Sequence, residues 1–247
     1  MTAFRRRVDI TASADHVRAA LEDDFHHFRV WANHCAGQVT AIGGEALRYP
    51  YSLCPQACDQ LQALVDMPLA RIAHTVTRQT DASHQCTHLL DLAGLAIASA
   101  ARGICRRRYA IQVGARIDGR TRARLTRDDG LVLNWEINGT MIESPSPYAG
   151  VNLREGMARW ALGTLSEDVA EAALLLRRCT LISMGRAYNL DEQVHATSSG
   201  RCYSQQAERA ERALRMKGST LDFSDEPQAL CAQDQTWLHA RPDGPTA

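Results

Sequence analysis

Three short polar segments contain the side chains of this chain that are best suited to chemistry. They are Asp23-Asp24-Phe25-His26-His27, Cys54-Pro55-Gln56-Ala57-Cys58 and Cys86-Thr87-His88. Each segment lies at the edge of an expected helix or strand, where ligands from distant parts of a chain can meet without disrupting a core. Because thiolate, imidazole and carboxylate groups bind zinc and ferrous iron, the sequence predicts a divalent metal site.

The neighbouring histidines differ in what they can reach. Side chains alternate across a strand, so Asp24 and His26 would share one face and His27 would lie on the other. His26 is therefore the favoured ligand, and a shift of the register by one residue would substitute His27. Cys86 and His88 would diverge inside a regular helix, but an irregular first turn would let both face one point.

The same residues have an interpretation without a metal. Asp24 and the two neighbouring histidines would then form the polar edge of a strand, Cys54 the start of a buried helix, and Cys86 part of the core. The arginine runs at 5–7 and 106–108 are expected to precede strands as solvated flanks and not to bind anions.

A hairpin and two helices are expected to position these segments. Residues 18–50 alternate between apolar and polar types, with Ala36-Gly37 as the turn between two strands. A short helix is expected over 54–65, where Pro55 fits the first turn. A buried, Ala-rich helix is expected over 86–102, with Ser83 as a candidate cap.

The second half of the chain is expected to begin with an antiparallel meander. Residues 109–139 alternate with period two, and Asp118-Gly119 and Asp129-Gly130 supply tight turns. Helices are expected over 153–162, 167–184 and 205–216. The predicted fold class is α+β: a part at 1–105 with the metal site, a part at 106–234 that is either separate or continuous with it, and a loose tail at 235–247.

Composition and charge exclude several classes of function. The 247 residues contain 28 Lys plus Arg and 28 Asp plus Glu, so no net basic field is available to bind nucleic acid or an anionic membrane surface. No apolar stretch is long enough to span a bilayer, and the N-terminus lacks the apolar part of a signal peptide. We therefore expect a cytoplasmic protein with reduced cysteines and a small-molecule partner; a homodimer stays open.

The segments EDDFHHFRV, RYPYSLCPQAC, QCTHLLDLA and ISMGRAYNL resemble a bacterial family catalogued only as a domain of unknown function. The resemblance spans most of the chain and includes GRCYSQQAERAERALRMKGSTLDFSD near the C-terminus. It implies no activity, because none is attached to the family.

Residues 18–102 also resemble iron–sulfur cluster scaffold proteins, in which a hairpin is followed by two helices that each open with a cysteine. In that family a Cys-Gly-Asp motif, a middle Cys and a late Cys, often preceded by His, bind zinc or a nascent cluster. On this pattern Asp24, Cys54 and Cys86 match three of the ligands.

The chain departs from the scaffold pattern at two positions. Glu22 stands in place of the first Cys, and Gln85 in place of the His before the last Cys, which argues against cluster assembly. The remaining site contains less sulfur, and His26 or His88 would complete it. Three protein ligands with a water in the fourth position are typical of catalytic zinc.

We therefore expect a metal-dependent enzyme, a Lewis-acid hydrolase or lyase that acts on a small organic carbonyl compound, with an aromatic acid or its thioester as one option. His27 and His88 are the expected acid and base. Arg186 would orient an anionic substrate or stabilise the end of a helix. The alternatives are a non-catalytic protein that handles metal or iron–sulfur clusters, and a ligand-binding module without a metal.

Overall fold

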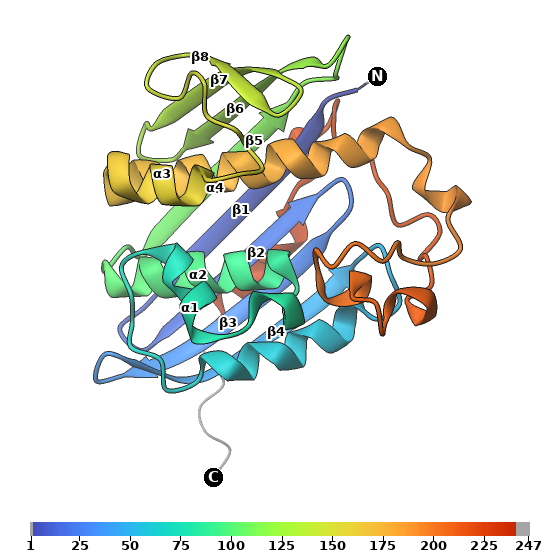
Figure 1. Cartoon of the computed structure of the whole chain (residues 1–247). Coiled ribbons are helices and arrows are strands. Elements are labelled where there is room, and N and C mark those ends of the chain that lie inside the picture. Colours follow the sequence, from blue (N-terminus) through green and yellow to red (C-terminus); the bar gives the residue numbers. More distant parts are fainter. Residues whose placement is uncertain (1, 241–247) are drawn as a thin grey trace.

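The structure, a computed structural model, describes residues 2–240 and is built on one eight-stranded antiparallel sheet (Figure 1). Its strands are β1 (Phe4–Ala12), β2 (His16–Asp23), β3 (His27–Cys35), β4 (Gln38–Arg48), β5 (Arg106–Val113), β6 (Arg120–Arg127), β7 (Val132–Asn138) and β8 (Met141–Ser144). The order β4-β3-β2-β1-β5-β6-β7-β8 joins two meanders through the pairing of β1 with β5.

Strand β1 makes the sheet continuous across the boundary expected near residue 105. Val8, which is fully buried, lies opposite Leu21 of β2 on one side and Tyr109 of β5 on the other. The arginine runs do not precede strands as solvated flanks: residues 5–7 lie within β1 and residues 106–108 within β5. That expectation was wrong because both runs pair within the sheet, and Arg6 and Arg107 are buried on its covered faces.

The helical segments follow the two meanders. They are η1 (Cys54–Leu64), η2 (Ala73–Thr75), α1 (Val76–Gln79), η3 (Ala82–His84), α2 (Thr87–Ala101), α3 (Met157–Thr164), α4 (Glu167–Ile182), η4 (Ser183–Ala187), η5 (Leu190–Glu192), η6 (Tyr203–Gln205), η7 (Ala210–Arg212), η8 (Pro227–Ala229), η9 (Ala232–Asp234) and α5 (Gln235–His239), where η denotes a 3-10 helix. Within the described residues no helix is long and apolar enough to cross a membrane.

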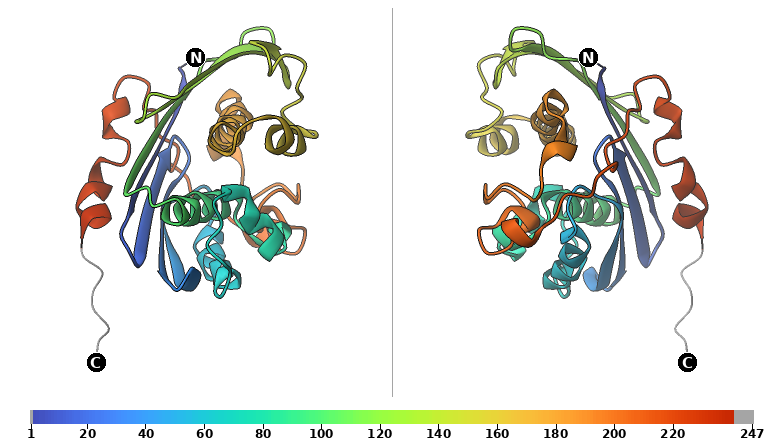
Figure 2. Two further views of the ribbon diagram at one scale, coloured as in Figure 1. Left: turned by 90° about the vertical axis from the view of Figure 1, so that its left-hand side faces the viewer. Right: turned by 90° about the vertical axis from the view of Figure 1, so that its right-hand side faces the viewer.

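The sheet separates two layers of unequal size. Helices α1 to α4 cover one face, whereas the C-terminal segment from η8 to α5 lies on the opposite face (Figure 2). Helix α2 contacts β1, β2 and β3, and α5 contacts β1 and β2. The central strands are therefore covered on both faces, which is why polar side chains such as Arg6 and Asp23 are buried there.

Helix α2 owes its central place to its composition. Eleven of its residues are buried, and most of these are Leu or Ala. Gly94 allows η2 to pack directly on the helix, because a Cβ atom at this position would overlap the carbonyl oxygen of Ala73. Close packing of this kind holds the middle of α2 against η2 and the start of α1.

Several expectations from the sequence are confirmed. The hairpin is β3–β4, with Ala36 and Gly37 at positive φ of 49° and 79° in its turn, although residues 18–23 of the expected span belong to the separate strand β2. The buried helix is α2, although Cys86 and not Ser83 is the residue that precedes it. The antiparallel meander is β5–β6–β7, with β8 in addition.

Other expectations were wrong. The segment at 205–216 is not a helix; it forms the short turn η7 and a bridge between Tyr51 and Arg215, because Ala210 and Ala213 pack on Tyr51 beside the end of β4. The 54–65 helix is the 3-10 helix η1. Residues 235–239 of the expected loose tail form α5 on the sheet, whereas 241–247 lie outside the described residues. The structure does not show the expected resemblance of residues 18–102 to iron–sulfur cluster scaffold proteins.

Candidate metal centre

The turn between β2 and β3 is fixed by the side chain of Asp23. Its Oδ1 atom accepts hydrogen bonds from the backbone N–H groups of Phe25 (2.7 Å) and His26 (2.8 Å). This pattern is a common way for an aspartate to close a tight turn. It returns the chain at once into β3, so that His26 lies on the helix-covered face beside Phe28, with 5.5 Å between ring centroids.

Asp23 also binds His26 and a buried arginine of β1. Asp23 Oδ1 lies 3.1 Å from His26 Nδ1, and Oδ2 accepts a hydrogen bond of 2.8 Å from Arg6 Nε and a second from Arg6 Nη2. Burial alone would raise the pKa of Asp23, but the Arg6 guanidinium holds it well below its usual range. Asp23 is therefore ionised, and His26 Nδ1 carries the proton that it donates.

His88, in the first turn of α2, stacks on His26. The ring centroids lie 3.9 Å apart, and the ring planes are inclined by 29°. His88 Nε2 is buried without a hydrogen-bond partner among the described residues. Burial lowers the pKa of His26 and, together with the neighbouring His26 ring, brings that of His88 well below its usual range. Both rings are therefore neutral near pH 7, the form in which imidazole binds metal ions.

Asp23, His26 and His88 each place one potential ligand atom within 4.8 Å of the others. The two carboxylate oxygens of Asp23 are already engaged by backbone N–H groups, His26 and Arg6. A carboxylate in this position orients a metal-binding histidine and leaves Nε2 of the ring with a free lone pair. Asp23 is therefore the orienting group, and the two imidazoles are the candidate ligands of zinc or ferrous iron.

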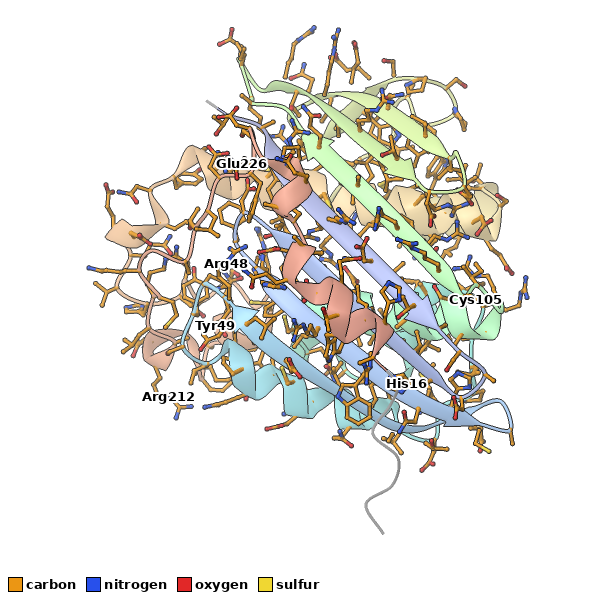
Figure 3. All side chains as sticks on the ribbon, turned by 180° about the vertical axis from the view of Figure 1, so that it is seen from behind. His16, Arg48, Tyr49, Cys105, Arg212 and Glu226 are labelled. Atoms are coloured by element: carbon orange, nitrogen blue, oxygen red, sulfur yellow. The ribbon has the colours of Figure 1, made fainter. Side chains whose placement is uncertain are left out.

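A second cluster lies on the opposite face of the sheet, where the C-terminal segment contacts the strands through Asp234. Figure 3 shows this segment crossing the strands near Arg48. His27 Nε2 lies 2.8 Å from Asp234 Oδ2, and His27 Nδ1 lies 3.6 Å from Glu22 Oε1. Arg29 Nε donates to Asp234 Oδ1 at 2.6 Å, and Arg48 Nη2 to Glu22 Oε1 at 3.3 Å. Because each carboxylate already has an arginine, this cluster is better suited to docking the C-terminal segment than to binding a metal.

Asp24, an expected ligand, contacts Arg186, an expected substrate-orienting residue. Arg186 Nη1 donates to Asp24 Oδ2 at 2.6 Å, and Arg186 Nη2 to Asp222 Oδ2 at 2.9 Å. Asp24 Oδ1 is buried with no hydrogen-bond partner among the described residues. Burial raises the pKa of Asp24 to about 7, although Arg186 opposes the shift. Arg186 thus has two carboxylate partners within the chain.

Cys54 and Cys86 lie at the N-terminal ends of η1 and α2. Cys54 Sγ lies 3.4 Å from Ser204 Oγ. Burial raises the pKa of Cys54 to about 11 and that of Cys86 well above its usual range, and the neighbouring Cys202 thiol adds to both shifts. The thiols are therefore protonated at neutral pH. Neither belongs to a group of converging metal-ligand atoms in the part of the chain that the structure describes.

Of the residues expected from the sequence, the structure brings His26 and His88 together and adds Asp23 and Arg6 to them. The other three expected ligands lie outside this group. A signal for Asp23 was present, because an aspartate three residues before a histidine can fix a turn with its side chain. Arg6 gave no signal, because its position within a run of arginines concealed the alternation of β1.

Comparisons with known proteins found no match for this chain among protein-family models, curated proteins or solved structures. The function has to be inferred from the site itself. The site offers two neutral imidazoles, one oriented by an ionised carboxylate and one with a buried, unpartnered nitrogen.

Proposed function

We propose that the protein is a metal-dependent enzyme, a Lewis-acid hydrolase or lyase for a small organic carbonyl compound, in which His26 and His88 bind zinc or ferrous iron. The observation that carries this proposal is the Asp23–His26 pair beside the buried, unpartnered Nε2 of His88. A buried polar atom without a partner costs about 1–3 kcal/mol. A metal ion bound at this nitrogen would remove that cost.

A single ion shared by both rings requires the stack to open. With ring centroids 3.9 Å apart and ring planes inclined by only 29°, the nitrogen lone pairs of His26 and His88 lie in nearly parallel planes, whereas the ligands of one ion point at a common centre. His26 is held through Nδ1 by Asp23, but His88 Nε2 has no hydrogen bond to lose. His88 is therefore the ring that would turn.

The charge balance of the site favours an anionic substrate. Arg6 neutralises Asp23, and both imidazoles are neutral, so the protein supplies no net negative charge to offset a divalent ion. Buried charges need partners, and a hydroxide or a substrate carboxylate would provide one. When bound, the ion would polarise a carbonyl group or bring the pKa of a bound water toward neutrality.

The metal content of protein purified without added metal, measured by inductively coupled plasma mass spectrometry, tests this proposal. We expect about one zinc or iron per chain in the wild type and loss of the metal in His26→Ala and His88→Ala. Asp23→Asn should weaken metal binding roughly 10–100-fold, as loss of an orienting partner does. His84→Ala is the matched control, because His84 is exposed and close to the same helix. Wild-type protein without metal, even after anaerobic purification and titration with zinc, would refute the proposal.

A second candidate function is the handling of metal or iron–sulfur clusters without catalysis. The observation that favours it is that the chain around Cys202 contacts the segments of Cys54 and Cys86: Cys54 Sγ lies 3.4 Å from Ser204 Oγ, and the Tyr203 N–H donates to the Gln85 carbonyl at 3.1 Å. Loss of metal in Cys54→Ser and Cys86→Ser, with full metal content in His26→Ala, would favour this function over the enzyme. Readily transferred metal would support it further.

A further inference from the structure

A small pocket with a cavity volume of about 60 Å³ lies between α2 and the α3–α4 pair, on the helix-covered face of the sheet. Figure 1 shows α4 running alongside α2 on this face. Apolar side chains form most of its walls: Ile72, Val76, Leu95, Leu162, Leu174 and Leu175. An apolar lining with a few charged groups is typical of sites for small organic ligands.

Among the charged side chains that line the pocket, one arginine has no carboxylate partner in the described part of the chain. The three carboxylates each have an arginine partner: Asp91 pairs with Arg178, Glu167 with Arg71 and Glu171 with Arg102. Arg177 pairs with none of the carboxylates in the described part of the chain; it donates only to the backbone carbonyls of Leu153 and Arg154.

Arg177 is poorly compensated in its surroundings. Burial lowers its pKa and the positive charge of Arg178 lowers it further, whereas the Asp91 carboxylate, already paired with Arg178, opposes the shift. Backbone carbonyls accept hydrogen bonds from the guanidinium but do not neutralise its charge, whereas a carboxylate can accept two parallel hydrogen bonds and supply the opposite charge. An anion in the pocket would therefore stabilise Arg177 more than water or a neutral ligand does.

The charged end of the pocket lies next to the candidate metal centre. Asp91 lines the pocket and lies three residues after His88 on α2, so both side chains face the same side of the helix. Arg178 lines the pocket and pairs with Asp91, with 2.7 Å between Arg178 Nε and Asp91 Oδ2. A ligand held at Arg177 would therefore have its polar end near this centre.

We propose that this pocket binds a small organic carboxylate with an apolar body, which pairs with Arg177. That this ligand is the substrate rests on the proposed function; its binding to the pocket does not, because Arg177 and the apolar walls are present without a metal. The proposal therefore has a test that needs no metal and no turnover.

Isothermal titration calorimetry on chelator-treated protein provides this test, with benzoate and hexanoate as probes and benzamide and hexanamide as their neutral counterparts. We expect each acid to bind at least about 10-fold more tightly than its amide. Arg177→Gln should remove this preference, and Arg177→Lys should retain part of it. Ala158→Phe, which adds a ring to the pocket wall, should abolish binding of both kinds of probe. Arg159→Gln is the matched control on the exposed side of α3.

Circular dichroism and thermal melting show that each variant is folded before it is titrated. No binding of any probe, equal binding of acids and amides, or an unchanged preference in Arg177→Gln would overturn the pocket proposal whatever the metal content. If protein purified without added metal contained no zinc or iron and bound none on titration, and yet preferred the acids, the pocket would be supported and the metal-dependent enzyme refuted. The two proposals can thus fail separately.

Discussion

Replacing Asp23 by Asn removes one charge from the buried network and changes little else. The Asn side chain keeps an oxygen that can accept the turn hydrogen bonds from Phe25 and His26. It loses the ionic partner of Arg6, whose side chain is 1% exposed and therefore has no access to water. The variant thus isolates the energetic role of the buried ion pair.

The expected loss of stability is large. Removing one partner of a buried ion pair costs about 3–5 kcal/mol, because the other charge stays buried and uncompensated. For a chain of this size each kcal/mol shifts the melting temperature by about 2–4 °C, so we expect Asp23→Asn to melt roughly 6–20 °C below the wild type. A double variant that also carries Arg6→Met should recover much of this loss, since no unpaired charge is left.

The dependence on pH gives a second readout. The pKa of Asp23 is lowered by folding, so its ionised form stabilises the protein above the unfolded-state value of about 3.9, and this contribution is lost as the pH falls through the lower folded-state pKa. The difference in unfolding free energy between wild type and Asp23→Asn should persist from pH 5 to 8 and narrow below about pH 4.

Urea unfolding followed by circular dichroism measures these differences. Glu136→Gln is the matched control, because it breaks an ion pair of 2.9 Å with Arg122 in which the side chains are 84% and 53% exposed. Exposed pairs contribute about 0–1 kcal/mol. If Asp23→Asn cost no more than this surface variant, the network of Arg6, Asp23 and His26 would not be the structural anchor of the site.

Three further predictions concern packing, thiol reactivity and the C-terminal segment. Gly94→Ala should lower the unfolding free energy, measured by urea unfolding, by about 1–3 kcal/mol, because its Cβ would overlap the backbone of η2. Gly163→Ala in α3 has open space around it and should raise the unfolding free energy by up to about 1 kcal/mol. Native protein treated with iodoacetamide at pH 8 should be modified at the exposed Cys35 but not at Cys54, because burial raises the pKa of Cys54 to about 11. Mass spectrometry of peptides measures this, and modification of Cys54 to the same extent as Cys35 would contradict the prediction. Asp234→Ala should speed proteolytic cleavage after residue 225, because this carboxylate holds the C-terminal segment on the sheet; unchanged cleavage rates would count against that role.

Local sequence patterns predicted the elements whose determinants are local. Period-two alternation with Ala36-Gly37 located the β3–β4 hairpin, and helical periodicity located α2 and α4 to within a few residues. Strand β1 was not identified, because its burial results from pairing with β2 and β5 and its three arginines lack an apolar alternation. The prediction of a helix over 205–216 was wrong for a similar reason. Its alanines pack against Tyr51, and no local pattern reveals this contact.

The candidate site was predicted in part, and the limit was again contact between distant segments. The sequence singled out His26 and His88 as residues capable of chemistry, and these two rings stack in the structure. It favoured Asp24 over Asp23, because alternation was extended into a stretch that proves to be a turn. A prediction that is wrong by one residue at this turn therefore selects Asp24, which pairs with Arg186, in place of Asp23, which orients His26.

Because Arg6 neutralises Asp23, the site needs a further anion to balance the charge of a divalent ion. Without this arginine, Asp23 would be a free buried carboxylate and a natural ligand for a cation. With it, the ion pair is neutral, Asp23 serves to orient His26, and the compensating charge for any bound divalent ion has to come from outside the protein. The pocket beside α2 contains Arg177, a cation with no carboxylate partner among the described residues, and offers a place for such an anion. A ligand carboxylate held there would help to offset the charge of the ion as well as that of Arg177, so metal and organic acid should bind cooperatively: zinc should tighten benzoate binding in the wild type, and this gain should be absent in His88→Ala.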